Sequence, residues 1–470
     1  MSVPATETRA LAARDQLTLA LDRAAGARPI EGNRLEHHPD SPRALNAMLA
    51  AIAAARRWVH FENYIIRDDA TGRHFADALA ERARAGVRVR VLYDALGSFG
   101  TSRRYWRRLV QAGVEVRAFH PLLTRHALDL LARDHRKLLV ADGAWAMTGG
   151  LCIGDEWAGD PARGRRPWRD TMIAVSGPAA AALDGTFARI WRRAGAPLPP
   201  DELDADPAVG GDSTVRVVEG VPGRARVYRA VELLAASAAE RLWITDAYLI
   251  APAPLYASLL DAARSGVDVR LLVPGTTDLP VLRNFTRVGY RDLLRAGVRV
   301  FEYQGPMIHA KTIVVDRRWA RVGSSNLNVS SLLTNYELDL AAECEGLTEE
   351  LARQFRHDLA SSQEIVLQPR RMRLPPRLAA GIAPDEADAP HKRSGYELGA
   401  VAVVALRRVA GGLRRAIAAT AALTCAAVGG LLVVFPRIMG VVFAAGAFTL
   451  ALAFGVYALE RRRARDSDDG

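Results

Sequence analysis

An eight-residue pattern, His-x-Lys followed by four residues and Asp, occurs twice in this chain of 470 residues. The first copy is HRKLLVAD at 135–142, and the second is HAKTIVVD at 309–316. A single copy has only three defined positions and is weak evidence, but two copies in matching context are not a chance event. A Gly-Gly pair follows the first copy at the same interval at which a Gly-Ser pair follows the second. The chain is therefore expected to contain two similar halves.

The similarity extends to the segments around the pattern. Three further pairs of segments correspond: residues 55–66 with 239–250, 84–91 with 264–271, and 111–116 with 295–300. In the last two pairs a glycine suited to capping a helix precedes an alternating, Val-rich strand. Helices alternating with strands predict an α/β fold for each half. A solenoid is not expected, because there are two long repeats rather than many short ones. We predict two similar lobes packed about a pseudo-twofold axis.

The repeated pattern also indicates a chemistry. His135 and Lys137 are two residues apart, as are His309 and Lys311, so on a strand each pair points to one side of the sheet. If the lobes pack about a twofold axis, two imidazoles and two ammonium groups meet in one site. Such a site supplies a nucleophile, a proton donor and fixed positive charge. These are the requirements for attacking a phosphodiester.

Composition narrows the setting of this chemistry. The formal net charge of +11 indicates an anionic partner, either lipid or nucleic acid, although the Ala- and Arg-rich usage of a GC-rich genome is an alternative explanation. The three cysteines, Cys152, Cys344 and Cys425, are far apart and odd in number, which argues against a disulfide framework. The N-terminus has no apolar run suited to a signal peptide.

The C-terminal region has a different character. Residues 416–435 and 438–459 are stretches of 20 and 22 residues without a charge, each long enough to cross a bilayer as a helix. Only Pro436 and Arg437 separate them, which predicts a tight transmembrane hairpin. Arginines flank both outer ends, so the positive-inside rule places both ends and the lobes in the cytoplasm, at the inner membrane. A buried helical hairpin in a soluble domain is the alternative.

These features predict a division of the chain into seven parts. They are an N-terminal extension (1–30), a first lobe (31–200), a second lobe (212–368), a linker (369–395), a basic juxtamembrane segment (396–415), the hairpin (416–460) and a cytoplasmic tail (461–470).

The duplicated motif resembles that of the phospholipase D superfamily, and the match covers residues 30–365. The motif of that superfamily continues to Gly-Gly/Ser-x-Asn, which the second copy satisfies with Asn326, whereas the first copy has Cys152. We expect Cys152 to be a packed small residue. Three further strings, GDEW at 154–157, WRDT at 168–171 and NYE at 335–337, are similar to bacterial cardiolipin synthases. The resemblance implies a bilobed fold with one site at the lobe interface.

The resemblance also implies roles for individual residues. His135 would be the nucleophile and His309 the general acid and base, with the reverse order left open by the near-symmetry of the repeat. The side chains expected to bind the phosphate oxygens are Lys137, Lys311, Asn326 and Ser324. Carboxylates should orient the imidazoles, and Asp170 and Glu337 are the candidates. Asp142 and Asp316 complete the catalytic motif, but we expect them to act mainly in the structure. No metal or other cofactor is required, since the lysines supply positive charge.

The leading function is a phosphatidyltransferase of cardiolipin synthase type, which joins two phosphatidylglycerols and releases glycerol through a phosphohistidine. The alternatives are a hydrolytic phospholipase D or another headgroup exchange, because water and alcohols compete for the same intermediate. A nuclease is less expected, since it gains nothing obvious from a membrane hairpin. The expected partners are an anionic phospholipid and the membrane, not nucleic acid, and the oligomeric state stays open.

Overall fold

The computed structural model describes residues 16–121, 132–205, 207–279, 283 and 286–367. All of them belong to one compact unit of the chain, 1–396. The predicted linker, juxtamembrane segment, hairpin and tail lie outside the described residues. No helix within the described ranges is long and apolar enough to cross a membrane.

The first lobe is an α/β layer. Its strands are β1 (Ile30–His38), β2 (Trp58–Asn63), β3 (Arg88–Asp94), β4 (Glu115–Phe119), β5 (Lys137–Ala141), β6 (Trp145–Gly149) and β7 (Met172–Ser176), and its helices are α2 (Ser41–Ala54), α3 (Ala70–Arg84), α4 (Arg103–Gln111), α5 (Asp155–Ala158) and α6 (Pro178–Arg193). The strand order is β1-β7-β6-β5-β2-β3-β4. Strands β2, β3 and β4 are parallel, with α3 and α4 as the crossovers between them.

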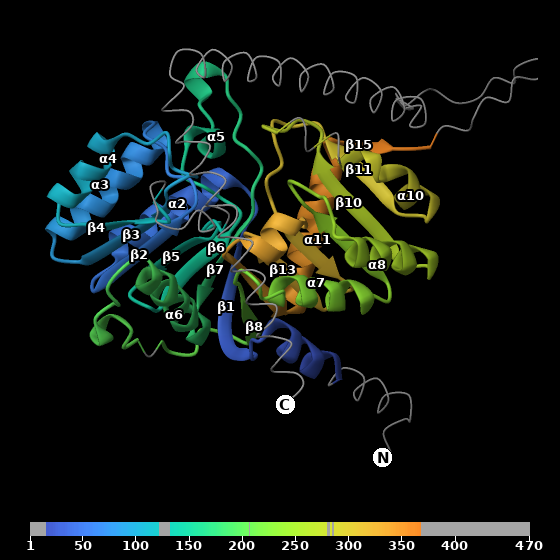
Figure 1. The fold of residues 1–470 in the computed structure, drawn as a ribbon, viewed down its shortest axis with the longest axis horizontal. Coiled ribbons are helices and arrows are strands. Elements are labelled where there is room, and N and C mark those ends of the chain that lie inside the picture. The colour runs from blue at the N-terminus through green and yellow to red at the C-terminus, as the bar shows by residue number, and fades with distance from the viewer. Residues whose placement is uncertain (1–15, 122–131, 206, 280–282, 284–285, 368–470) are drawn as a thin grey trace, which may run out of the picture. The chain divides into compact units, whose positions relative to one another are not determined.

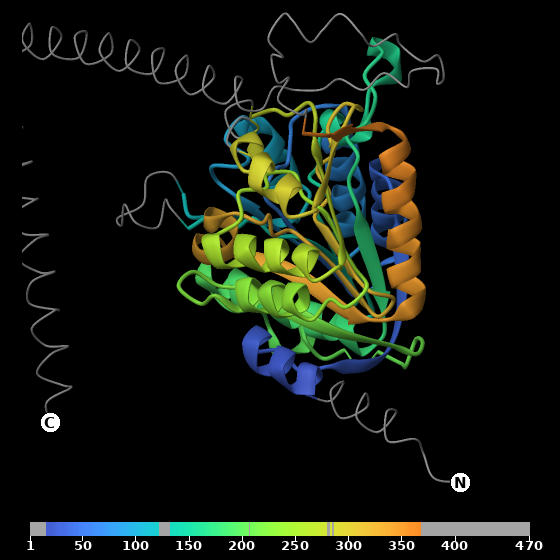
Figure 2. The same ribbon diagram turned by 90° about the vertical axis from the view of Figure 1, so that its right-hand side faces the viewer.

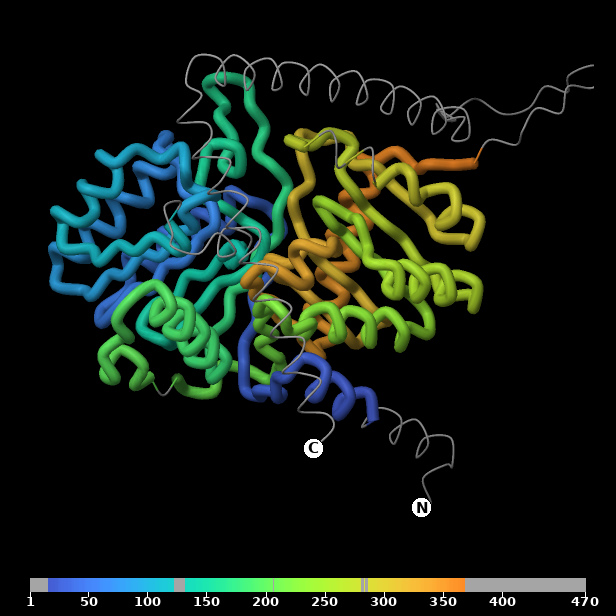
Figure 3. Tube along the Cα trace, viewed as in Figure 1, coloured from blue at the N-terminus to red at the C-terminus, as the bar shows by residue number. Residues whose placement is uncertain are grey.

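The second lobe repeats this order. Its strands are β8 (Ser213–Gly220), β9 (Arg241–Thr245), β10 (Asp268–Pro274), β11 (Arg299–Tyr303), β12 (Thr312–Val315), β13 (Trp319–Gly323), β14 (Glu337–Glu343) and β15 (Ser362–Ile365), and its helical segments are α7 (Arg226–Ala236), α8 (Ala253–Arg264), α10 (Tyr290–Arg295), η4 (Ser330–Thr334) and α11 (Glu345–Ala360). The order β8-β14-β13-β12-β9-β10-β11 matches the first lobe, and β15 extends the edge beyond β11. The predicted α/β fold is confirmed, and Figures 1 and 3 show the lobes side by side.

The lobes join through antiparallel pairing of β1 with β8, so the described strands form one continuous sheet. Helices α6 and α11 strengthen this junction, because each packs against strands of its own lobe and against β1 or β8 of the other. Figure 2 shows α11 on the opposite side of the strands from α7 and α8. One hydrophobic cluster, which includes Phe187 and Trp191 of α6 and Phe355 of α11, therefore extends across both lobes.

Each motif forms a β-hairpin, β5–β6 in one lobe and β12–β13 in the other. The motif aspartates, Asp142 and Asp316, occupy the turns with φ of 56° and 52°, a left-handed conformation that Asp tolerates better than most residues. The Asp142 carboxylate accepts backbone N–H groups from residues 56–58, and that of Asp316 accepts them from residues 239–241. These contacts tie each motif hairpin to the start of the neighbouring strand, and they involve no other predicted site residue.

Candidate active site

Two short backbone bridges connect the lobes beside the motif histidines. The N–H of His135 donates to the carbonyl of Tyr336 at 3.0 Å, and the N–H of His309 donates to the carbonyl of Arg169 at 2.7 Å. Both bridges run parallel. Each motif histidine is thereby held next to the segment of the other lobe that carries a predicted orienting carboxylate. The two carboxylates, Asp170 and Glu337, each lie at or just before a strand, β7 and β14.

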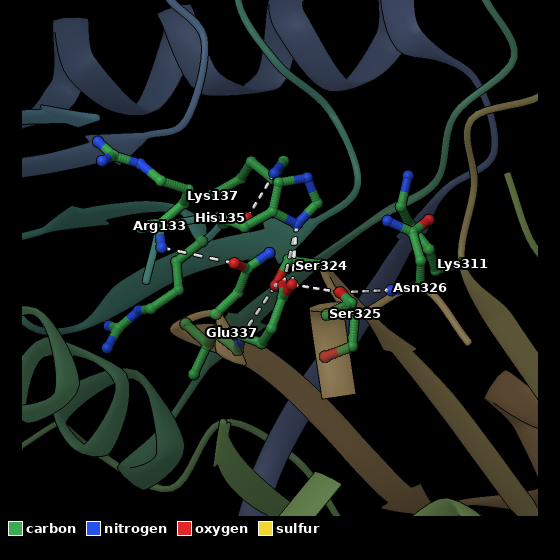
Figure 4. A network of polar contacts seen from close by, with 12 residues as sticks. Arg133, His135, Lys137, Lys311, Ser324, Ser325, Asn326 and Glu337 are labelled. Atoms are coloured by element: carbon green, nitrogen blue, oxygen red, sulfur yellow. Dashed lines mark hydrogen bonds and ion pairs between the residues drawn. The ribbon is translucent and has the colours of Figure 1, made fainter. Parts of the chain in front are cut away.

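Glu337 contacts the histidine of the opposite lobe. Its two carboxylate oxygens are each 3.0 Å from Nδ1 of His135, and Figure 4 shows the imidazole directed at them. The hydroxyls of Ser324 and Ser331 also donate to this carboxylate. Burial by itself would raise the pKa of Glu337. His135, Lys137 and Ser324 together have the larger, opposite effect, so the pKa is lowered to about 2. Glu337 is therefore a carboxylate at neutral pH.

Asp170 makes the reciprocal contact in the other direction. Its Oδ2 lies 2.7 Å from Nδ1 of His309 and accepts the indole N–H of Trp157 at 3.2 Å. Burial opposes ionisation, yet the contact with His309 lowers the pKa of Asp170 overall. The rings of Trp157, Trp168 and Tyr248 surround His309, with centroids 5.6, 5.9 and 6.0 Å away. The environment of His309 is thus more aromatic than that of His135, against which Tyr64 packs at 4.8 Å.

The turns that follow the two motifs differ at one position, which is Gly150 in the first lobe and Ser324 in the second. The contacts of the orienting carboxylates explain this difference. Gly150 and Ser324 occupy equivalent positions, each donating its N–H to the residue after the orienting carboxylate. A Cβ at Gly150 would lie 2.2 Å from Oδ1 of Asp170, so no side chain fits there. The longer Glu337 leaves room for the Ser324 side chain and accepts its hydroxyl. Asp pairs with Gly in one lobe, and Glu with Ser in the other.

Both motif lysines are fully buried beside the histidines. Lys137 donates to the carbonyl of His135, and Lys311 donates to that of His309 while its Nζ lies 3.0 Å from Nε2 of the same imidazole. Burial lowers the pKa of Lys311 to about 8, against the opposing effect of Asp170. Burial and then Lys311 lower the pKa of His309 to about 4, and burial also lowers the pKa of His135. Both imidazoles are therefore neutral near pH 7.

The two histidines open into one pocket of about 560 Å³ between the lobes. Other residues of its wall are Tyr64, Ile65, Arg67, Cys152, Trp157, Trp168, Tyr248, Ile250, Asp278, Leu279, Asn326, Asn328, Val329, Ser330, Ser331 and Asn335. Asn326 is 5% exposed, and its Oδ1 has no hydrogen-bond partner among the described residues. Cys152, the equivalent residue of the first lobe, is buried and has a pKa raised by burial. The structure thus brings together the predicted His, Lys, Asn and carboxylate side chains.

Several wall residues were not assigned a site role from the sequence. Ser331 donates to Glu337 and accepts the N–H of Asn326, which links the orienting carboxylate to the predicted phosphate ligand. It lies in η4, a short π-helix, where no motif or periodicity marks it. Tyr64 and Tyr248 also lie on the pocket wall. Within the described ranges, no group of three or more His, Cys, Asp or Glu side chains is arranged to hold a metal ion.

Comparison with known proteins agrees with this geometry. The profile of a family described as "Cardiolipin synthase, PLD-like domain" matches residues 48–191 and 232–359. The chain belongs to this family. Cardiolipin synthase A of Pseudomonas aeruginosa (strain LESB58) is 36% identical over 349 residues, 73% of this chain and 70% of that protein. Cardiolipin synthase 2 of Bacillus cereus is 35% identical over 326 residues, 68% of this chain and 63% of that protein.

Among solved structures, a phosphatidylserine synthase from Haemophilus influenzae Rd KW20 aligns with a TM-score of 0.61. The alignment covers 74% of this chain and 92% of that chain at 14% identity, which shows a shared fold. The predicted membership of the phospholipase D superfamily, in its cardiolipin synthase branch, is confirmed.

Proposed function

We propose that this member of the cardiolipin synthase family transfers a phosphatidyl group from one phosphatidylglycerol to another, releasing glycerol. The observation that carries the proposal is the crosswise pairing of His135 with Glu337 and of His309 with Asp170 around one pocket. Each imidazole is held through Nδ1. Nε2 of His135 is then free to attack phosphorus, whereas Nε2 of His309 lies 3.0 Å from Nζ of Lys311 and must exchange that contact for the leaving oxygen. Two imidazoles so held suit a two-step displacement at phosphorus.

In the first step, Nε2 of His135 attacks phosphorus and a P–N bond forms as the P–O bond to glycerol breaks. The nucleophile is neutral, because burial lowers the pKa of His135. As the ring becomes cationic, Glu337 stabilises it, and His309 gives a proton to the departing glycerol oxygen. Although the pKa of His309 is about 4 in the free site, a bound phosphodiester anion raises it by favouring the imidazolium. Asp170 acts in the same direction.

In the second step, the hydroxyl of another phosphatidylglycerol attacks the phosphohistidine. His309 accepts the hydroxyl proton, the P–N bond breaks, and His135 is released as the neutral imidazole. The non-bridging oxygens gain negative charge in both transition states. Lys137, Lys311 and the amide of Asn326 would stabilise that charge. No step requires a metal or other cofactor.

The setting of the reaction is also part of the proposal. We propose that residues 416–460 form a hairpin in the inner membrane, with both lobes on the cytoplasmic side, because the two stretches are uncharged and arginines flank their outer ends. The partners are then the bilayer and its anionic phospholipid. Nucleic acid is not a partner in this proposal.

Incubating the purified full-length protein with phosphatidylglycerol vesicles tests the proposal. The expected products are cardiolipin and glycerol in equal amounts, absent with His135→Ala. Phosphatidic acid as the main product would instead identify a hydrolytic phospholipase D. Cleavage of DNA, with no change in the lipid, would identify a nuclease.

A further inference from the structure

A second, smaller cavity lies in the second lobe beside the pocket that contains the histidines. Its volume is about 160 Å³, and its wall consists of Leu249, Ile250, Ala251, Tyr256, Leu259, Thr286, Gly289, Tyr290 and Leu293. These residues belong to the segment after β9, to α8, and to α10 with the turn before it. Ile250 belongs to the walls of both cavities, so the two cavities adjoin at this side chain.

The wall of this cavity is mainly apolar. Three of its side chains carry hydroxyls, and each hydroxyl donates to the protein: Tyr256 to the carbonyl of Gly289 at 2.6 Å, Thr286 to that of Leu249 at 2.9 Å, and Tyr290 to Glu302 at 3.2 Å. A hydrocarbon that lies against such a wall is removed from water, which is favourable, whereas a polar headgroup would find few hydrogen-bond partners there. The cavity therefore suits a hydrocarbon chain better than a headgroup.

The first lobe fills the corresponding space differently. Its helices α3 and α4 correspond to α8 and α10, and the buried Tyr105 of α4 donates its hydroxyl to the carbonyl of Gly72 in α3 at 2.8 Å. Tyr105 and Trp106 pack edge to face at 4.9 Å, and Trp106 stacks on Tyr93 at 3.8 Å. Leu259 and Leu293 have leucine counterparts in the first lobe, Leu79 and Leu109, but Gly289 of the cavity wall corresponds to Tyr105, whose ring is buried. The second lobe therefore has an open cavity at a place that the first lobe fills with side chains.

We infer that this cavity, between α8 and α10, receives part of one acyl chain of a phospholipid whose headgroup phosphate is at the histidines. The inference rests on the proposed function, since only a lipid substrate has such a chain. The chain runs from the larger pocket past Ile250 and lies against Leu259 and Leu293. Burial of each methylene group contributes about 0.8 kcal/mol. The cavity therefore makes the enzyme prefer lipids with long chains over otherwise identical lipids with short ones.

The substitution Leu259→Trp tests this by filling the cavity from α8, where Leu259 is 1% exposed. Ala257→Trp is the matched control, because it adds an indole to the same helix at an exposed position. The full-length proteins are compared on dioleoyl and on soluble dihexanoyl phosphatidylglycerol. We expect Leu259→Trp to lower kcat/KM for the dioleoyl lipid about tenfold, the equivalent of roughly two methylene groups, and to leave the dihexanoyl lipid within about twofold. Ala257→Trp should change neither.

Equal effects of Leu259→Trp on both lipids would overturn the inference. If the unsubstituted protein transfers no phosphatidyl group from either lipid, the proposed function is overturned instead. The experiment thus distinguishes failure of the inference from failure of the proposed function. Repeating the comparison with a soluble alcohol as acceptor separates the two possible sources of the chain. If the chain-length effect persists, the bound chain belongs to the phosphatidyl donor; if it disappears, the chain belongs to the acceptor lipid.

Photochemical cross-linking decides the matter if Leu259→Trp fails to fold. Phosphatidylglycerol with a diazirine in one acyl chain is bound to the unsubstituted protein in vesicles. The sample is then illuminated, and mass spectrometry identifies the labelled peptides. We expect label within 249–264 and 286–295, and competition by unlabelled dioleoyl but not by dihexanoyl lipid. Absence of label from both segments would overturn the inference.

Discussion

The carboxylate of Glu337 lies 3.0 Å from Nδ1 of His135, and the two residues belong to different lobes. Asp170 and His309 form the reciprocal contact at 2.7 Å. Neither lobe by itself thus contains a motif histidine together with its carboxylate partner. The parallel bridges on either side hold these contacts in register, because they fix the backbone directly before each histidine. Loosening of the lobe interface would separate both pairs at once, which makes the site a property of the assembled unit.

Replacing Glu337 by Gln tests the importance of this contact. The amide has nearly the same shape, but it cannot stabilise a cationic imidazole as a carboxylate does. We expect kcat to fall by roughly 10²–10⁴-fold, with little change in thermal unfolding. Glu349→Gln is the control, since Glu349 is a partly exposed carboxylate paired with Arg241 away from the pocket. Normal phosphatidyl transfer by Glu337→Gln would show that the contact serves only folding.

Adding a methyl group at Gly150 tests the close approach of Asp170. The new Cβ would lie 2.2 Å from Oδ1 of Asp170, so the carboxylate must move away from His309. We expect Gly150→Ala to lose both activity and about 1–3 kcal/mol in the free energy of unfolding. Gly346→Ala is the control, because a Cβ there meets nothing within 4 Å. If both variants unfold at the same denaturant concentration, the packing around Gly150 is looser than the structure indicates.

The pH dependence of kcat/KM should report the loss of the proton from Lys311. Its pKa of about 8 means that the ammonium group loses its proton as pH rises through that value. Because kcat/KM reflects the free enzyme, in which His309 already loses its proton above about pH 4, the fall of kcat/KM with pH should become steeper above about pH 8 as the charge that stabilises phosphate is lost. Lys311→Arg should be slower at neutral pH but should not show this steeper decline, since a guanidinium stays protonated. An unchanged alkaline limb in Lys311→Arg would assign the titration to another group.

Truncation after residue 383 should separate catalysis from membrane residence. The last described strand, β15 (Ser362–Ile365), pairs with β11 and precedes the cut, so no described core residue is removed. We expect a folded, soluble protein that still acts on dihexanoyl phosphatidylglycerol. Circular dichroism and sedimentation with vesicles provide the measurements. An unfolded product, or one that sediments completely with membranes, would contradict the predicted division at the linker.

The repeated helix–strand segments were sufficient to predict the α/β lobes. Asp170 and Glu337 could be selected as candidates because each is a carboxylate at an apolar strand that follows a motif. The crosswise partnership of these carboxylates was not predictable from one sequence. It depends on which backbone segments meet across the lobes, and a strand pattern contains no information about that. Ser331 escaped notice for a related reason: its importance comes from the fold of η4, which brings its hydroxyl to Glu337. The roles of these residues in catalysis remain predictions.

The last prediction concerns the division of labour between the histidines. If His135 is the nucleophile, His135→Ala cannot form a covalent intermediate. If His309 is the general acid, His309→Ala still contains the attacking group, but glycerol is a poor leaving group without a proton. General acid assistance is typically worth about 10²–10⁴-fold. A p-nitrophenyl phosphodiester has a leaving group that needs no proton, so it should label the His309→Ala protein and not the His135→Ala protein.

Mass spectrometry of the trapped protein identifies the labelled imidazole. Label on His135 supports the proposed order, in which Glu337 stabilises the cationic phosphohistidine. Label on His309 would reverse the roles and leave the reaction class intact, a possibility that the equal strand order of the two lobes keeps open. The aromatic enclosure of His309 would then surround the nucleophile rather than the acid. Turnover without label on either histidine would contradict the two-step mechanism, since it would require the acceptor alcohol to attack phosphorus directly.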